Sequence, residues 1–463
     1  MTTSTASNVG VRALQPPGPK RHFPMGNLAE FNRDTIKFML ENRQYGSLTL
    51  FYFGPYPAYV VNDAELNHEV LLESTAAYKK AELTRTVLNP ILGNGLFTSE
   101  GDFWKRQRKL VQPSFHAKRI GEYAAIMARY ASDLADEWAG MVNSPRPIDM
   151  DMQRLTMRII AKTLFDADIN KDASGIGEAV RESLALVEES FKQIFVLPEW
   201  MPTPHNRRLK AAVTRLDKLI QGFIDARRVS GEDKGDFLSL LLSARDADDN
   251  SQMTDKQVRD EAMTLFGAGH ETTAVTMTWT WYLLSQNPQV EAKLHDELDR
   301  VLAGRLPTLA DLPNLPYTEM VIKESMRLYP AAWGVTRSTA QDVTLGGFPI
   351  PKERVLFVNV IGMHYDPQYF ADPQEFIPER FSPENEKDIP KHAYIPFGGG
   401  PRVCIGNSFA MLEARMLLAT LAQRFKIALM PGFEVVPDRQ FTLKPKYGMQ
   451  MIIKERQPMS VLA

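Results

Sequence analysis

Apolar residues recur at three- and four-residue spacing over long stretches of this chain, a pattern that predicts helices. One helix is expected to begin at Thr254, because Gln257 follows as the partner in a capping box, and to run to Pro288 with Gly267 and Gly269 interrupting it. At 1.5 Å per residue it would be about 45 Å long, enough to cross a domain. The same spacing predicts helices over residues 103–111, 119–141, 150–164, 207–229, 288–302, 316–328 and 408–425.

Alternating polar and apolar residues predict a smaller amount of sheet. Residues 48–53 and 58–61 are expected to form a hairpin around Gly54. Residues 338–360 are typical of strands and turns, and residues 441–454 of a closing hairpin. The expected fold class is therefore mainly α with a minor β region.

The composition is that of a globular protein, with 463 residues, 44% of them hydrophobic and 24% charged, and a formal net charge of −2. The near-neutral balance gives no basic stripe for nucleic acid, and the single cysteine excludes an intramolecular disulfide. Residues 1–20 are expected to form a flexible leader without a signal sequence, and residues 21–463 a single domain. The most apolar stretch, 262–285, contains His270 and Glu271, so we expect it inside the protein. We expect no integral membrane segment, a cytoplasmic location and a monomer.

The only cysteine, Cys404, lies in the loop Phe-Gly-Gly-Gly-Pro-Arg-Val-Cys-Ile-Gly, directly before a predicted helix. A lone cysteine is most often a small buried hydrophobic residue. Here the glycines allow a planar group to approach, Arg402 supplies a cation, and the helix N-terminus favours a thiolate. No partner histidine indicates a cysteine protease, and no companion ligands indicate a zinc site. One thiolate fits a metal whose other positions are filled by a macrocycle, for which haem is the leading candidate.

The cysteine loop resembles a known signature. Phe397, Gly400, Arg402, Cys404 and Gly406 occupy the fixed positions of F-x-x-G-x-R-x-C-x-G, the haem-binding motif of the cytochrome P450 monooxygenases. The resemblance implies the P450 fold, with haem b (iron protoporphyrin IX) between the long central helix and the helix after the cysteine loop. It implies that Cys404 ligates the iron, that Phe397 borders the haem, and that one atom of O₂ is inserted into an apolar substrate.

The long helix carries the sequence Ala-Gly-His-Glu-Thr-Thr from Ala268 onward. A close crossing with another helix would explain glycine and threonine there. The alternative is a local widening in which an acid and a hydroxyl pass protons during dioxygen cleavage. The segment resembles the P450 motif A/G-G-x-D/E-T, which implies that Glu271 and Thr272 are catalytic. It also implies that Ala268, Gly269 and Thr272 face the haem, whereas His270 is expected to be structural.

A set of charged residues also matches the family. Glu324 and Arg327 lie at i and i+3 on a predicted helix, which alone is weak evidence for a special role. The segment Pro-Glu-Arg-Phe follows, with its arginine at position 380. The resemblance therefore implies that Glu324, Arg327 and Arg380 form a buried network that supports the cysteine loop.

Haem propionates require cationic or N–H partners. Trp104 and Arg108 lie at i and i+4, which by itself fits an amphipathic basic helix with a tryptophan anchor. The resemblance to the W-x-x-x-R helix of the family implies instead that both bind a propionate, together with Arg337 and Arg402.

No phosphate-binding flavin or nicotinamide motif follows Cys404, so electrons are expected from a separate ferredoxin or flavodoxin with its reductase. A basic patch beside the cysteine loop would bind such an acidic partner, although a solvated helix face explains the same residues nearly as well. The patch consists of Lys105, Arg106, Lys109, Lys118 and Arg119.

Short segments such as Gly95–Thr98 and Thr442–Pro445 resemble the bacterial fatty-acid hydroxylase branch of the family. In well-known members of that branch an arginine in the first hairpin anchors the substrate carboxylate, and Pro55 stands there in this chain, with Tyr59 as a remaining donor. A fatty acid, a terpenoid, a carotenoid and a steroid-like molecule therefore all stay open as substrates. The expected pocket walls are Val87, Leu88, Phe191, Phe266, Ala332, Val335 and Leu443.

Two other functions compete with the monooxygenase. One is a peroxygenase that consumes H₂O₂ without a reductase, and the other is a haem-binding protein without turnover. Members of the first kind usually lack the acid–alcohol pair, and the second kind has no use for it. The presence of Glu271 and Thr272 therefore favours the monooxygenase.

Overall fold

The computed structural model describes residues 14–73, 76–168, 182–183, 185–191, 198, 200–246 and 250–456. Most of the expected leader lies outside the described residues. Its last part is bound to the fold, because the Leu50 N–H donates to the Pro17 carbonyl at 2.8 Å. A Cβ at Gly18 would lie 1.9 Å from the Leu50 carbonyl oxygen, so this contact requires glycine.

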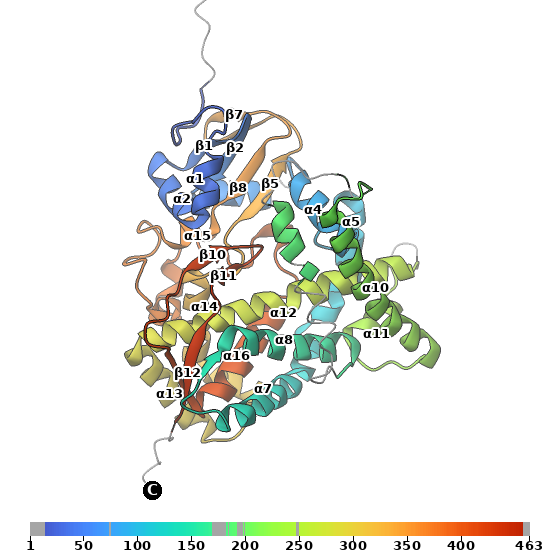
Figure 1. Cartoon of the computed structure of the whole chain (residues 1–463), viewed down its shortest axis with the longest axis vertical. Coiled ribbons are helices and arrows are strands. Elements are labelled where there is room, and N and C mark those ends of the chain that lie inside the picture. Colours follow the sequence, from blue (N-terminus) through green and yellow to red (C-terminus); the bar gives the residue numbers. More distant parts are fainter. Residues whose placement is uncertain are drawn as a thin grey trace, which may run out of the picture.

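Helices form most of the molecule, as expected, and α12 (Asp255–Gln286) runs across it (Figure 1). Its capping box is present, with Thr254 and Gln257 exchanging hydrogen bonds of 2.8 and 3.3 Å. The helix expected over residues 119–141 is divided at Tyr123. The other α-helices are α1 (Leu28–Arg33), α2 (Thr35–Asn42), α3 (Ala64–His68), α4 (Glu82–Leu92), α5 (Gly101–Val111), α6 (Ala117–Glu122), α7 (Ala124–Ala139), α8 (Ile148–Phe165), α10 (Pro204–Ser230), α11 (Phe237–Ser243), α13 (Pro288–Leu302), α14 (Pro316–Leu328), α15 (Val360–His364) and α16 (Asn407–Ala422). None of the helices in the described part of the chain is long and apolar enough to cross a membrane.

The central helix is continuous from Asp255 to Gln286, so the expected long helix is confirmed and the two glycines do not break it. A Cβ at Gly269 would lie 2.9 Å from Cδ1 of Ile160 on α8. The Thr156 hydroxyl, also on α8, donates to the His270 carbonyl at 2.9 Å. Gly269 therefore permits a close helix crossing, and its place beside the haem stays a prediction.

Within the described ranges the strands form one larger sheet and three small ones, and the larger sheet has the order β1-β2-β8-β5-β3. The expected first hairpin is confirmed, with Leu50 opposite Tyr59 in an antiparallel pair. The expected closing hairpin is wrong, because β11 pairs with β10 whereas β12 pairs with β4 and β9. The strands are β1 (Leu48–Phe53), β2 (Tyr56–Val61), β3 (Tyr78–Lys79), β4 (Pro145–Pro147), β5 (Val335–Thr339), β6 (Val343–Leu345), β7 (Phe348–Ile350), β8 (Val355–Val358), β9 (Phe425–Leu429), β10 (Pro437–Arg439), β11 (Leu443–Pro445) and β12 (Gln450–Glu455).

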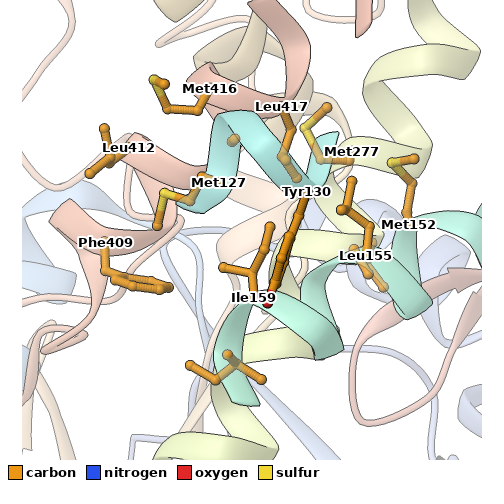
Figure 2. Close-up of a cluster of buried hydrophobic side chains, with 14 of the residues drawn as sticks. Met127, Tyr130, Met152, Leu155, Ile159, Met277, Phe409, Leu412, Met416 and Leu417 are labelled. Atoms are coloured by element: carbon orange, nitrogen blue, oxygen red, sulfur yellow. The ribbon is translucent and has the colours of Figure 1, made fainter. Parts of the chain in front are cut away.

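The main hydrophobic core joins α7, α8, α12 and α16. Figure 2 shows Met127 and Tyr130 of α7 close to Ile159 of α8, Met277 of α12 and Leu417 of α16, all of them buried. Close-packed side chains resist displacement. The core therefore holds α12 in a fixed position relative to α16, the helix that follows the cysteine loop.

Candidate active site

Cys404 lies in a tight loop directly before α16. Its N–H donates to the Phe397 carbonyl at 3.0 Å, and the Val403 N–H donates to the Gly400 carbonyl at 3.0 Å. Gly400 has a φ of 67°, and a Cβ there would lie 1.9 Å from the Leu71 carbonyl oxygen. Only glycine fits this position, so the loop geometry depends on the glycine-rich sequence.

The Cys404 side chain is exposed, yet burial raises the pKa of its thiol. The Gly406 N–H and the Arg108 guanidinium lower the pKa by less than burial raises it. Binding of a metal to the sulfur would displace its proton.

One face of α12 is open in the middle of an otherwise buried helix. Ala268 is exposed and Thr272 is half-buried, four residues apart on the same face. The Thr272 hydroxyl donates to the Ala268 carbonyl at 2.9 Å. This open strip is the surface that the sequence predicts to face the haem.

Glu271 points to a different side of α12 and is only 3% exposed. Its carboxylate accepts a hydrogen bond of 3.0 Å from the Thr442 hydroxyl and forms an ion pair with Lys444. The neighbouring His270 is buried, bonds the Phe266 carbonyl through Nδ1 at 3.0 Å, and has its pKa lowered by burial. His270 is thus built into the helix packing, as expected.

Helix α5 and the cysteine loop are joined by cations. The Arg402 guanidinium lies 3.7 Å from the centre of the Trp104 ring and donates to Glu100 Oε2 at 2.6 Å. Arg108 donates to the Val403 carbonyl at 2.9 Å. Burial lowers the pKa of Arg402 to about 10. The structure therefore brings together Trp104, Arg108 and Arg402, which the sequence assigned to haem binding.

Arg337 and Lys80 belong to the same cluster, and Lys80 was not expected. Arg337 is only 8% exposed. Burial, together with Arg337 and Arg402, holds the pKa of Lys80 far below its usual value. The three cations share one carboxylate, that of Glu100. An excess of buried positive charge lowers the stability of a protein unless an anion compensates it. The propionates of a haem would be such anions, so the cluster fits this cofactor.

The predicted network under the loop is present. Arg327 is fully buried and donates to both carboxylate oxygens of Glu324 at 2.7 and 2.8 Å. The same carboxylate accepts a bond of 3.3 Å from Arg380. Arg327 also donates to the carbonyls of His364 and Pro373, both at 2.8 Å. The planar guanidinium thus joins two segments of the loop-rich region to α14.

His364, which was not predicted, extends this network to Ile395, just before the cysteine loop. Its Nδ1 bonds the Arg327 carbonyl at 3.1 Å, and its Nε2 accepts the Ile395 N–H at 3.1 Å. This pairing requires a proton on Nδ1 and none on Nε2. Burial, assisted by Arg327, lowers the pKa of His364 to about 3, so the ring is neutral.

The residues expected to line the substrate pocket differ in their burial. Phe191 stacks on Phe441 with ring centres 6.5 Å apart, and Phe441 meets Phe97 at 6.1 Å. Phe441 and Phe97 were not expected. Of the seven predicted residues, Ala332 is exposed, Phe191 and Val335 are half-buried, and Val87, Leu88, Phe266 and Leu443 are buried.

The expected basic patch is partly neutralised. Arg106 pairs with buried Asp246 at 2.9 Å, and Lys105 pairs with Asp102 at 2.9 Å. Arg119 lies 3.5 Å from a carboxylate oxygen of Glu122. Arg106 therefore contributes to internal packing as well as to surface charge.

Comparisons with known proteins agree with this geometry. The family model "Cytochrome P450" matches residues 16–452. "Cyclooctatin synthase" of Streptomyces melanosporofaciens is 38% identical over 417 residues, 89% of each chain. "Cyclooctat-9-en-7-ol 5-monooxygenase" of the same organism is 35% identical over 414 residues, 88% of each chain.

A solved structure, "Crystal structure of cytochrome P450DA heme domain", superimposes with a TM-score of 0.89 at 25% identity, covering 96% of this chain and 98% of that one. The comparisons confirm the expected family and fold, but neither of the two relatives is named for a fatty acid. The chain therefore belongs to the cytochrome P450 family and is a haem monooxygenase that uses O₂, a substrate and a redox partner.

Proposed function

We propose that this P450 oxygenates a terpenoid, a cyclic hydrocarbon or its alcohol, rather than a fatty acid. The observation that carries the proposal is the aromatic row Phe191, Phe441 and Phe97. Phe97 lies under Lys80 of the cationic cluster, 4.0 Å from the ammonium to the ring centre, and Phe441 precedes Thr442, which bonds Glu271. The row thus extends along the reaction site and offers the flat apolar surface that a ring system contacts.

Two further observations support a substrate without a carboxylate. Pro55 is exposed in the turn between β1 and β2, where fatty-acid hydroxylases carry an anchoring arginine. Tyr59, the other donor considered, is 6% exposed and packs in the hydrophobic cluster of the sheet. The name of one relative describes a cyclic alkenol as its substrate.

The residues of the site have different roles. When bound, haem supplies the activation of O₂ and the transfer of one oxygen atom to the substrate. Cys404 would ligate its iron, and its propionates would be held by Lys80, Arg108, Arg337, Arg402 and Trp104. Glu271 and Thr272 pass protons to the open strip of α12.

Electrons come from a separate ferredoxin or flavodoxin that docks beside the cysteine loop. The exposed lysines Lys105, Lys109 and Lys118 provide the positive surface for it. The protein acts as a single-domain monomer in the cytoplasm.

The test is product analysis with ¹⁸O₂, a surrogate ferredoxin system and NADPH. We expect cyclic terpenes and their alcohols to gain one ¹⁸O atom, and saturated fatty acids to give at least tenfold less product. Oxidation of fatty acids alone would contradict the substrate class. Equal product from H₂O₂ without a reductase would indicate a peroxygenase, and no product from any substrate would indicate a haem carrier.

A further inference from the structure

Glu100 connects three segments of the chain at the cationic cluster. Its Oε1 accepts the N–H of Lys80, which follows β3, at 3.0 Å, and its Oε2 accepts a bond of 2.6 Å from Arg402 of the cysteine loop. Glu100 itself directly precedes α5, and its carbonyl accepts the Trp104 N–H at 3.3 Å. Both carboxylate oxygens therefore bind segments of the chain other than the one that carries them.

A helix-capping role does not explain this side chain. Glu100 is the N-cap residue of α5, a position where a side-chain oxygen often accepts an N–H of the first helical turn. The Glu100 side chain makes no such bond to α5, every residue of which the structure describes. Its oxygens bond Arg402 and Lys80 instead, so the role of its carboxylate lies outside the helix.

Arg402 is fixed from several sides by the segment that begins α5. Its Nη1 donates to the Ser99 carbonyl at 2.9 Å, its Nη2 donates to Glu100, and its guanidinium lies over the ring of Trp104. Two hydrogen bonds and a stacked ring leave a planar guanidinium a single orientation. Ser99, Glu100 and Trp104 together thus determine which N–H groups of Arg402 remain for a haem propionate.

The Glu100 carboxylate also changes the charge of the cluster. Burial lowers the pKa of Lys80 and of Arg337, and the negative charge of Glu100 opposes this effect in both. The Glu100 side chain is 25% exposed, so water and salt screen its charge less than that of a surface residue. A fixed negative charge beside a partly buried site disfavours the addition of an electron there, because like charges repel more strongly at low dielectric.

We propose that Glu100 is a positioning residue that holds Arg402 in the orientation that binds a haem propionate, and that its charge lowers the reduction potential of the bound haem. The proposal rests on the assignment of the propionates to the cationic cluster and does not depend on the substrate class. With Glu100 in place, ferric haem accepts an electron from the redox partner less readily than it would beside a neutral residue. Glu100 itself exchanges neither an electron nor a proton.

The first test separates the charge of Glu100 from its hydrogen bonds. Glu100→Gln removes the negative charge but keeps an oxygen that can accept from Arg402. Asp102→Asn, two residues further along, removes a carboxylate whose side chain is 96% exposed, and is the matched control. In a spectroelectrochemical titration of the haem-loaded enzyme without substrate, we expect Glu100→Gln to shift the reduction equilibrium about fivefold toward the reduced form. Asp102→Asn should leave the equilibrium unchanged.

Three results of this titration contradict the proposal. They are an unchanged equilibrium in Glu100→Gln, a shift toward the oxidised form in Glu100→Gln, and an equal shift in Asp102→Asn. The last result would show that any carboxylate on the surface has the same effect.

The second test measures the positioning of Arg402 through haem retention. We expect Glu100→Ala to transfer haem to apomyoglobin several-fold faster than the wild type, because Arg402 loses a charged hydrogen-bond partner. Glu100→Gln should transfer it more slowly than Glu100→Ala. Wild-type retention of haem in Glu100→Ala would overturn the proposal. If Glu100→Ala does not fold, Glu100→Asp, whose side chain is one methylene shorter, takes its place.

Arg337→Met distinguishes the proposal from the propionate assignment on which it rests. Wild-type haem retention in Arg337→Met would refute the cationic cluster as the propionate site, and the role of Glu100 with it. Fast haem loss in Arg337→Met, together with wild-type retention in Glu100→Ala, would refute the role of Glu100 alone.

Discussion

The central carbon of the Arg402 guanidinium lies over the Trp104 ring, 3.7 Å from the ring centre. A cation over an indole face contributes on the order of 1 kcal/mol when partly desolvated. We expect Trp104→Ala to release Arg402 and to speed haem loss about fivefold, the rate equivalent of that energy. The measurement is haem transfer to apomyoglobin. Trp104→Phe keeps an aromatic face and should lose haem more slowly than Trp104→Ala; equal rates would argue against the stacking.

Cys404 is the expected ligand of the haem iron. We predict that Cys404→Ala abolishes the red-shifted Soret band of the reduced carbon-monoxide complex, because no thiolate remains to donate electron density. The measurement is the reduced CO difference spectrum. Retention of the red-shifted band in the variant would exclude this ligand.

Thr272 is expected to act in proton delivery rather than in substrate binding. Thr272→Ala should bind substrate normally but divert electrons from product, with the coupled fraction falling several-fold. Product formed per NADPH consumed measures this. Thr278→Ala is a matched control, because Thr278 makes the same kind of bond to the carbonyl four residues before it but is buried. Unchanged coupling in Thr272→Ala would remove Thr272 from the relay.

Arg327 and Glu324 are both fully buried. Removing the cation alone leaves an uncompensated carboxylate, so Arg327→Met should lower the free energy of unfolding by about 3–5 kcal/mol. Urea titration measures the loss. The double variant with Glu324→Gln should recover part of it, and Arg300→Ala on the exposed side of α13 should cost little.

His364 predicts a loss of stability in acid. Its folded pKa is about 3 against 6.5 for the free side chain, so only the unfolded state binds a proton between these values. Stability is full above pH 6.5 and falls as the pH is lowered, by about 2 kcal/mol from this group at pH 5. His364→Gln should remove this contribution. Urea titrations at pH 7 and pH 5 measure this contribution as the difference in unfolding free energy between wild type and His364→Gln. Exposed His22→Gln is the control. If that difference is the same at both pH values, the prediction is wrong.

The sequence identified those parts of the site that are encoded by local spacing. Cys404 and its loop, the pair Glu324 and Arg327, and the pair Trp104 and Arg108 are each contained in a few consecutive turns or loop positions. Helix and loop geometry alone places these side chains close together.

Partners from distant segments could not be predicted in this way. Lys80, His364 and Lys444 reach their partners only through tertiary packing, and no spacing rule connects them to the motifs. The wrong closing hairpin has the same cause, since β12 pairs with β4, which lies about 300 residues earlier. The burial of the Cys404 thiol, which raises its pKa, likewise depends on tertiary packing that no spacing reports.

The hydrogen bond between Thr442 and Glu271 joins residues 171 positions apart in the chain. During synthesis, α12 leaves the ribosome long before the segment around β11 has been made. The cysteine loop is also complete before that segment appears. A nascent chain halted between α16 and β10 would therefore contain the expected haem ligand but lack Thr442 and Lys444, the two residues that hold Glu271.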